Sequence, residues 1–266
     1  MQNEINIPII LDAVRKVGNV FLKDYKQNAI PQTMEELLKQ LDDIDTICLA
    51  SLKEDLSAEF PDIIWHIGDE FDTNSQRNPA QQGDYWLCDA MDGAIQYLQH
   101  IAGWTINLVL VREGKPVFSV IFDPFANEMF WAKDGDGAFM NDQSLKISSK
   151  TDLAVMLAVF EYGHQDKSDN YLNEKIGSTV THLLKNFGIV RNYGPHGLQL
   201  AYVGAGRIDL FVQEDLDTYN WIAGLLIAKE AGAEILTTNG NPWKWGDENL
   251  LVAPKNTTEK YLKITK

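Results

Sequence analysis

The sequence has few cysteines, fewer basic than acidic residues and no long apolar segment, and each shortage excludes a class of protein. Its 266 residues include only two cysteines, Cys48 and Cys88, which are too few for a disulfide framework. Lysine and arginine number 23 against 38 aspartates and glutamates, and the net charge of −15 argues against a surface for nucleic acid or an anionic membrane. No run approaches the roughly 18 apolar residues that a membrane span requires.

The N-terminal segment has no basic region followed by an apolar stretch, so we expect no signal peptide. Both cysteines should then remain reduced, which predicts a cytoplasmic protein. Hydrophobic residues make up 45% of the chain and aromatic residues 10%, which is enough for a substantial core. A chain of 266 residues has room for one large domain or for two tightly packed lobes.

The most informative segment is 89–94, which reads Asp-Ala-Met-Asp-Gly-Ala. A Gly-Asp-Glu triplet ends at Glu70, 19 residues before Asp89. Hard cations such as Mg²⁺ bind where several carboxylate oxygens converge, and a glycine turn exposes backbone N–H groups that bind phosphate. The segment therefore predicts a site for a metal ion and a phosphate group. A bound cation would also let so acidic a chain accept an anionic substrate.

Segment 89–94 resembles the Asp-Pro-Ile/Leu-Asp-Gly-Thr signature of the inositol monophosphatase family. These are Mg²⁺-dependent phosphomonoesterases of the superfamily that includes fructose-1,6-bisphosphatase. Three further blocks agree with the family in order and spacing: the triplet 68–70, the Asp-Pro…Glu…Gly-x-Gly-Ala…Asn stretch within 123–141, and the Gly-Arg-Ile-Asp…Ala-Gly…Glu-Ala-Gly stretch within 206–232. The resemblance extends from about residue 60 to the end of the chain.

The resemblance implies an α/β fold, a five-layer α/β/α/β/α sandwich that is usually dimeric, so we expect a homodimer. The short polar stretch near 144–152 predicts the boundary between lobes. We therefore expect an N-terminal α+β lobe over 1–148 that carries most of the metal ligands. A C-terminal α/β lobe over 149–266 would complete the active site.

Hydrophobic periodicity and turn residues predict where the individual elements lie. The expected helices cover 10–25, 34–52, 172–187, 196–203 and 219–231. The expected strands cover 104–111, 116–122, 128–132, 155–162, 208–213, 234–237 and 250–253, the last of which closes the chain. Residues 135–141 are expected to form a turn, and the polar stretch 72–84 a surface loop near the mouth of the site.

The resemblance also implies that the site holds two or three Mg²⁺ ions. Glu70 and Asp89 would hold the first ion together with the backbone carbonyl of Met91. Asp89 and Asp92 would hold the second, with Asn220 as a further ligand. Glu70 would in addition orient the attacking water, so Glu70, Asp89 and Asp92 are the expected catalytic residues.

The same resemblance implies which residues would contact a small phosphorylated substrate. The N–H groups of Gly93 and Ala94 would hold phosphate oxygens, at a site typical of a helix N-terminus. His196, Gln213 and Asn220 occupy the remaining substrate-contacting positions, and all three differ from the family pattern. His196 lies in what is a Gly-Ser-Ala stretch in the family, and Gln213 replaces a glutamate.

Two departures bear directly on activity. Ala94 replaces a threonine whose hydroxyl would help to polarise the attacking water, and His196 is a candidate to do so instead. Asn220 replaces an aspartate, so that it offers a carbonyl oxygen to a cation but no charge. Asp217 lies three residues before Asn220 and has two possible roles: it replaces the missing charge, or it caps a helix.

These observations predict a Mg²⁺-dependent phosphomonoesterase that hydrolyses a small phosphorylated polyol such as inositol monophosphate. Two alternatives stay open at this point. One is a bisphosphonucleotide or sugar-phosphate phosphatase of the same superfamily. The other is a catalytically impaired paralogue that binds a metal ion or ligand, and Ala94, Gln213 and Asn220 favour it. We expect neither nucleic acid nor a membrane as a partner.

Overall fold

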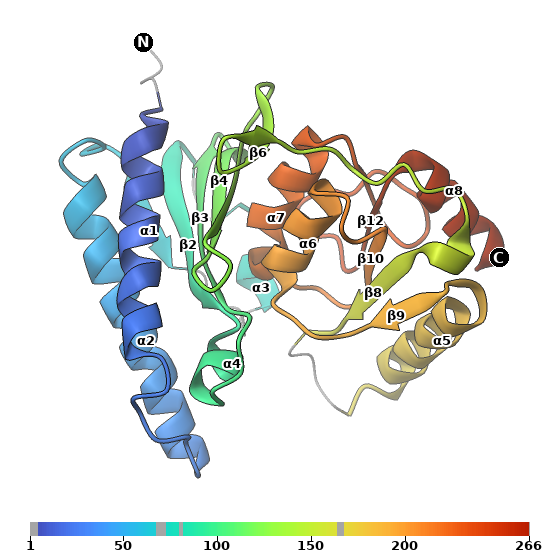
Figure 1. Cartoon of the computed structure of the whole chain (residues 1–266), viewed down its shortest axis with the longest axis horizontal. Helices are drawn as coiled ribbons and strands as arrows, with labels where there is room; N and C mark the ends of the chain where they lie inside the picture. Colours follow the sequence, from blue (N-terminus) through green and yellow to red (C-terminus); the bar gives the residue numbers. More distant parts are fainter. Residues whose placement is uncertain (1–4, 68–72, 80–81, 164–167, 266) are drawn as a thin grey trace.

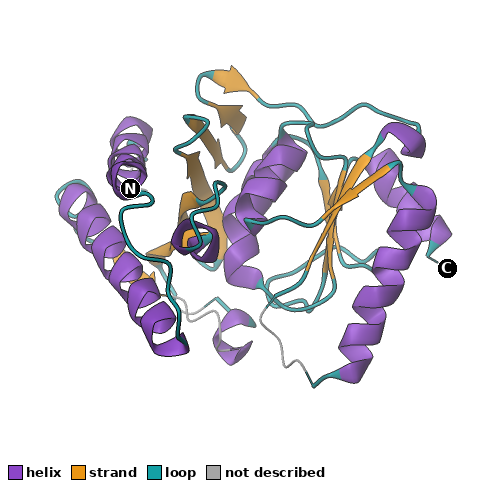
Figure 2. Cartoon of the chain, turned by 60° about the horizontal axis from the view of Figure 1, so that its bottom comes forward, coloured by secondary structure: helices purple, strands orange, loops and turns teal. Residues whose placement is uncertain are grey.

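The computed structural model describes residues 5–67, 73–79, 82–163 and 168–265. Helices and sheets alternate in five layers, with α1 and α2 on one outer side and α5 and α8 on the other (Figure 1, Figure 2). The chain therefore has the expected α/β/α/β/α sandwich architecture. The helices of the three helical layers are, in order, α1 (Ile7–Asp24) and α2 (Met34–Leu56), α6 (His196–Gly204) and α7 (Thr218–Glu230), and α5 (Asn170–Asn186) and α8 (Lys255–Ile264).

The outer pair of helices forms where apolar residues recur at helical spacing. In α1 the buried side chains Ile10, Val14, Val17 and Phe21 lie on one face, against the first sheet. The start of α2 is fixed by Thr33, whose hydroxyl accepts a hydrogen bond from the backbone N–H of residue 36. These helices cover the outer face of the first sheet and leave its other face to the central layer.

The first sheet has seven strands in sequence order. Only β1 and β2 pair in parallel, and the other neighbours are antiparallel. The turn between β3 and β4 is the dipeptide Glu113-Gly114, with φ of 49° and 73°, as a two-residue hairpin turn requires. The strands are β1 (Ile64–Ile67), β2 (Asp84–Asp92), β3 (Thr105–Arg112), β4 (Lys115–Asp123), β5 (Glu128–Lys133), β6 (Gly137–Met140) and β7 (Gln143–Ser144).

The second sheet has five strands in the order β11-β12-β10-β8-β9. Strands β8 and β10 are parallel, and their register pairs Glu161 with Gln213. Because each residue is the last of its strand, this pairing places two polar side chains together at the carboxyl ends of β8 and β10. The strands are β8 (Leu157–Glu161), β9 (Ile189–Arg191), β10 (Leu210–Gln213), β11 (Glu234–Leu236) and β12 (Leu250–Ala253).

The central helices α6 and α7 pack between the two sheets in a shared apolar core. That core joins Phe130 of the first sheet, Trp221 of α7 and Phe211 of the second sheet. The two helices approach closely at Gly224, where an added Cβ would lie 2.4 Å from the Cβ of Leu200. Their close packing fixes the N-terminal ends of α6 and α7 relative to both sheets, and those ends form the site.

Several elements differ from the sequence predictions. Residues 135–141, expected to form a turn, contain strand β6, because Gly137–Met140 pairs with β5. The chain does not close with the strand at 250–253, since α8 follows it, and the polar stretch 72–84 contains the short helix α3 (Thr73–Gln76). The remaining short helices are α4 (Ala94–Leu98) and a single 3₁₀ turn at Leu153–Val155. Within the ranges that the structure describes, no helix is long and apolar enough to cross a membrane.

Candidate active site

The site begins where β2 ends. Asp89 pairs with Asn107 of β3 and Asp92 with Thr105, so the register shifts between the two aspartates. This irregularity in the ladder is a β-bulge, which redirects side chains at the end of a strand. Gly93 follows with φ of 87° and leads directly into α4, and a Cβ there would lie 2.9 Å from the carbonyl oxygen of Gly103. Glycine is therefore required at this turn.

The carboxylate of Asp92 is buried, with 5% of the residue exposed, and is held from two directions. Its Oδ2 atom accepts hydrogen bonds from the backbone N–H of Gly197 in α6 at 2.7 Å and from Asn107 Nδ2 at 3.2 Å. The Asn107 amide is itself oriented by Thr105, whose hydroxyl donates to Asn107 Oδ1 at 2.9 Å. Burial raises the pKa of Asp92 to about 6, although the charge of His196 and these hydrogen bonds act to lower it.

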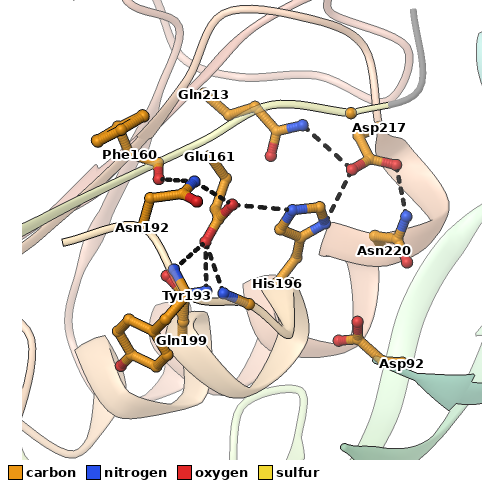
Figure 3. A network of polar contacts seen from close by, with 12 residues as sticks. Asp92, Phe160, Glu161, Asn192, Tyr193, His196, Gln199, Gln213, Asp217 and Asn220 are labelled. Atoms are coloured by element: carbon orange, nitrogen blue, oxygen red, sulfur yellow. Dashed lines mark hydrogen bonds and ion pairs between the residues drawn. The ribbon is translucent and has the colours of Figure 1, made fainter. Parts of the chain in front are cut away.

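His196 is the first residue of α6, and its ring lies between two carboxylates (Figure 3). Nδ1 is 3.0 Å from Asp217 Oδ2, and Nε2 is 3.4 Å from Glu161 Oε2. Only 14% of the side chain is exposed. Burial alone would lower the pKa of His196, but the hydrogen bonds to Asp217 and Glu161 raise it well above its ordinary value.

Glu161, at the end of β8, accepts hydrogen bonds from several groups besides the histidine. Asn192 Nδ2 donates to Oε2 at 2.7 Å, while Gln199 Nε2 and the Gly194 N–H donate to Oε1 at 2.6 and 2.9 Å. Burial would raise the pKa of Glu161, but the hydrogen bond from His196 and these donors lower it. The balance holds the pKa of Glu161 below its ordinary value in spite of its burial.

Asp217 contacts the other side of the His196 ring and lies at the start of α7. It stands at the N-cap position, yet its side chain makes no capping hydrogen bond, so the expected capping role is wrong. Its Oδ2 accepts from Gln213 Nε2 at 3.1 Å, and its Oδ1 accepts from Asn220 Nδ2 at 2.7 Å. Gln213 Oε1 in turn accepts from Trp221 Nε1 at 2.8 Å. Both polar atoms of the Gln213 amide are thus engaged within the protein.

The structure brings some of the predicted site residues together through this network. His196, Gln213 and Asn220 all bond to Asp217, and the residue after His196 bonds to Asp92. The other predicted residues lie where β2 leads into α4. Asp89 and Met91 lie on β2, Gly93 precedes α4, and Ala94 is the first residue of α4. Glu70 lies outside the described residues.

The described part of the chain contains no three His, Cys, Asp or Glu side chains placed to hold a metal ion together. For the first predicted metal position, the described residues supply the carboxylate of Asp89 and the backbone carbonyl of Met91. With the carboxylate of Glu70, these ligand atoms would all be oxygen, as Mg²⁺ prefers. The predicted second position is different. There Asp92 Oδ2 is held by protein donors, and the amide nitrogen of Asn220 points to Asp217.

Sequence reasoning missed three residues that build this site: Asn107, Glu161 and Gly197. Asn107 and Glu161 carried a signal, since each is a polar residue in a predicted strand that is mostly apolar. Gly197 carried none, because its role is a close approach: an added Cβ would lie 3.0 Å from Asp92 Oδ2 and 2.8 Å from Asn107 Nδ2.

Comparisons with known proteins agree with this architecture. A model of the inositol monophosphatase family matches residues 4–266. A protein named Nus factor SuhB from Xylella fastidiosa is 27% identical over 238 residues, covering 88% of this chain and 82% of that protein. An inositol-1-monophosphatase from Rhizobium meliloti is 34% identical over 149 residues, 55% of this chain and 54% of that protein. The solved structure of an IMPase from Thermotoga maritima has a TM-score of 0.78 at 22% identity, covering 97% of this chain and 96% of that one, and supports the fold.

Proposed function

The chain belongs to the inositol monophosphatase family, and we propose that it is a Mg²⁺-dependent phosphomonoesterase acting on a small phosphorylated polyol. The observation that carries the proposal is the corner at which β2 ends. Asp89 and Asp92 flank the bulge there, and Gly93 leads into the first turn of α4. Carboxylates and exposed backbone N–H groups are the donors that a cation and a phosphate group need in one place.

Several residues at this corner, together with Glu70, would have separate chemical tasks in the proposed reaction. Glu70, Asp89 and the Met91 carbonyl would hold Mg²⁺, which would neutralise charge on the phosphoryl group and favour a nucleophilic water. The N–H groups of Gly93 and Ala94 would orient phosphate oxygens. Ala94 has no hydroxyl, so it cannot assist the loss of a proton from the attacking water. We therefore expect slow turnover with ordinary phosphate binding.

A second candidate is a protein of this family that binds metal or ligand but turns over poorly. The engaged side chains favour it: Gln213, expected to contact substrate, is hydrogen-bonded to Asp217 and Trp221 instead. Several relatives carry the name Nus factor SuhB rather than that of a phosphatase. The two candidates differ in turnover, because both would bind the cation and the phosphate group.

Release of inorganic phosphate from a panel of substrates, with and without Mg²⁺, tests the proposal. The panel contains inositol monophosphate, a sugar phosphate and a bisphosphonucleotide, and Asp89→Asn is the control for contaminating phosphatases. Mg²⁺-dependent release that the control lacks supports the phosphatase. Mg²⁺ binding by calorimetry without release from any substrate supports the second candidate. We also propose a homodimer, which light scattering on the purified chain tests.

A further inference from the structure

The surroundings of the His196 ring suit its doubly protonated form. A neutral imidazole has one nitrogen that only accepts hydrogen bonds. Here both nitrogens face carboxylate oxygens, of Asp217 at 3.0 Å and Glu161 at 3.4 Å. A carboxylate oxygen that faces an accepting nitrogen would be repelled, so this arrangement suits an imidazolium.

Burial acts to raise the pKa of both carboxyls, but His196 and the donor groups that the described residues place around them lower it. The Glu161 carboxylate receives hydrogen bonds from the side-chain amides of Asn192 and Gln199, and the Asp217 carboxylate from those of Gln213 and Asn220. A protonated carboxyl would have to donate one hydrogen bond itself. The cluster therefore suits a protonated His196 between two ionised carboxylates.

A protonated His196 would lie close to Asp92, one of the expected ligands of the second metal ion. Gly197, the next residue, donates its N–H to Asp92 Oδ2 at 2.7 Å, and the charge of His196 acts on the Asp92 carboxyl. The other expected ligand, Asn220, is uncharged and turns its amide nitrogen toward Asp217. Affinity for hard cations depends on the charge of the ligands, and a fixed cation nearby opposes the entry of a second one.

We propose that the imidazolium of His196, fixed between Glu161 and Asp217, takes the place of the second divalent cation in this site. The protein then binds a single divalent ion, on the Asp89 side, and His196 supplies positive charge beside Asp92. His196 is in this view neither a general base nor a metal ligand, because both of its nitrogens are engaged. The inference rests on the proposed metal-dependent function.

The test counts bound Mn²⁺ ions per chain, by calorimetry and by electron paramagnetic resonance, in the wild type and in three variants. The variants are His196→Asn, Asn220→Asp and the double variant that combines them. Lys175→Gln serves as a matched control, since it removes a different cation from a buried carboxylate, that of Glu214 at 2.7 Å. Circular dichroism establishes that each variant is folded.

We expect one ion in the wild type, in the control and in Asn220→Asp, and a second ion in the double variant. That second ion should bind at least about tenfold more tightly than any second ion in Asn220→Asp, which is the size of effect that a neighbouring unit charge has on a carboxylate's proton. A merely structural role for His196 would lower the melting temperature without changing the number of ions.

Two ions in the wild type would overturn the inference and leave the proposed function standing. A full second ion in Asn220→Asp alone would also overturn it, because His196 would then exclude nothing. If the His196 variants do not fold, the numbers of ions bound by the wild type and by Asn220→Asp still test the inference. No bound ion in any of the proteins would overturn the proposed metal-dependent function itself.

Discussion

Replacing Gly197 by alanine should destabilise the protein through a single close contact. The added Cβ would lie 3.0 Å from Asp92 Oδ2 and 2.8 Å from Asn107 Nδ2, so α6 would have to move away from β2 and β3. The move weakens the 2.7 Å hydrogen bond from the Gly197 N–H to the buried carboxylate of Asp92. Among the described residues the other donor to Asp92 is Asn107, which the same methyl group displaces.

The magnitude follows from three contributions. Loss of a hydrogen bond to a charged group costs about 1.5–3 kcal/mol, and overpacking in a close-packed interior costs about 1–3 kcal/mol. Alanine regains at most about 1 kcal/mol over glycine within a helix. The net loss should be about 1.5–5 kcal/mol, and for a chain of this size the melting temperature should fall by roughly 3–20 °C.

Thermal unfolding followed by circular dichroism measures this effect, with Gly177→Ala as the matched control. Gly177 lies on the exposed side of α5, and an added Cβ there has nothing within 4 Å. The control should raise stability by about 0.5–1 kcal/mol through helix propensity alone. If Gly197→Ala is as stable as wild type, α6 is free to move off Asp92, and the close approach does not hold the site.

Three further outcomes are expected. Asp89→Asn should abolish both Mg²⁺-dependent phosphate release and the rise in melting temperature on adding Mg²⁺, measured by thermal shift, since a ligand that binds only the folded state stabilises it. Ala94→Thr should raise kcat by about tenfold or more with little change in KM, in steady-state kinetics, because a hydroxyl assists proton transfer only in the transition state. Replacing His196 by asparagine should destabilise the fold most between the ordinary pKa values of Asp217 and His196, 3.8 and 6.5. The stability that His196 contributes is lost as pH rises through its raised pKa in the folded protein. The stability that Asp217 contributes is lost as pH falls through its lowered pKa. Urea unfolding at a series of pH values shows whether the difference in stability from wild type follows this course.

Helices α1, α2, α5, α6 and α7 and the central hairpin could be predicted from sequence because their signals are local. The apolar face of α1 recurs every three or four residues, and the turn at Glu113-Gly114 specifies its own geometry. Strand β2 could not be predicted in this way. Its residues Tyr85 to Cys88 are buried in succession and show no alternation, because the strand has neighbours on both edges and helices over both faces of its sheet.

The candidate site likewise has one part that the local sequence predicts and another part that depends on the fold. The segment 89–94 carries its chemistry within six consecutive residues, so it could be identified from sequence. The cluster around His196 depends on where β8, α6 and α7 meet, which is set by the parallel pairing of Glu161 with Gln213 and by the packing of the two helices. A sequence alone shows these residues as isolated departures from a pattern, and their contacts appear only in the fold.

Considered one at a time, the departures from the family pattern at His196, Gln213 and Asn220 would each be expected to impair an enzyme. Their contacts show instead that the three residues are compatible with one another. All three contact one carboxylate, that of Asp217, the two amides through hydrogen bonds and His196 through an ion-pair contact. A glutamate at 213 or an aspartate at 220 would bring a second carboxylate to within about 3 Å of it, and like charges that close are strongly unfavourable without a cation between them. The two amides remove that repulsion, and the imidazolium supplies the cation. The positions therefore depend on one another, and restoring one acidic residue alone does not restore a metal site.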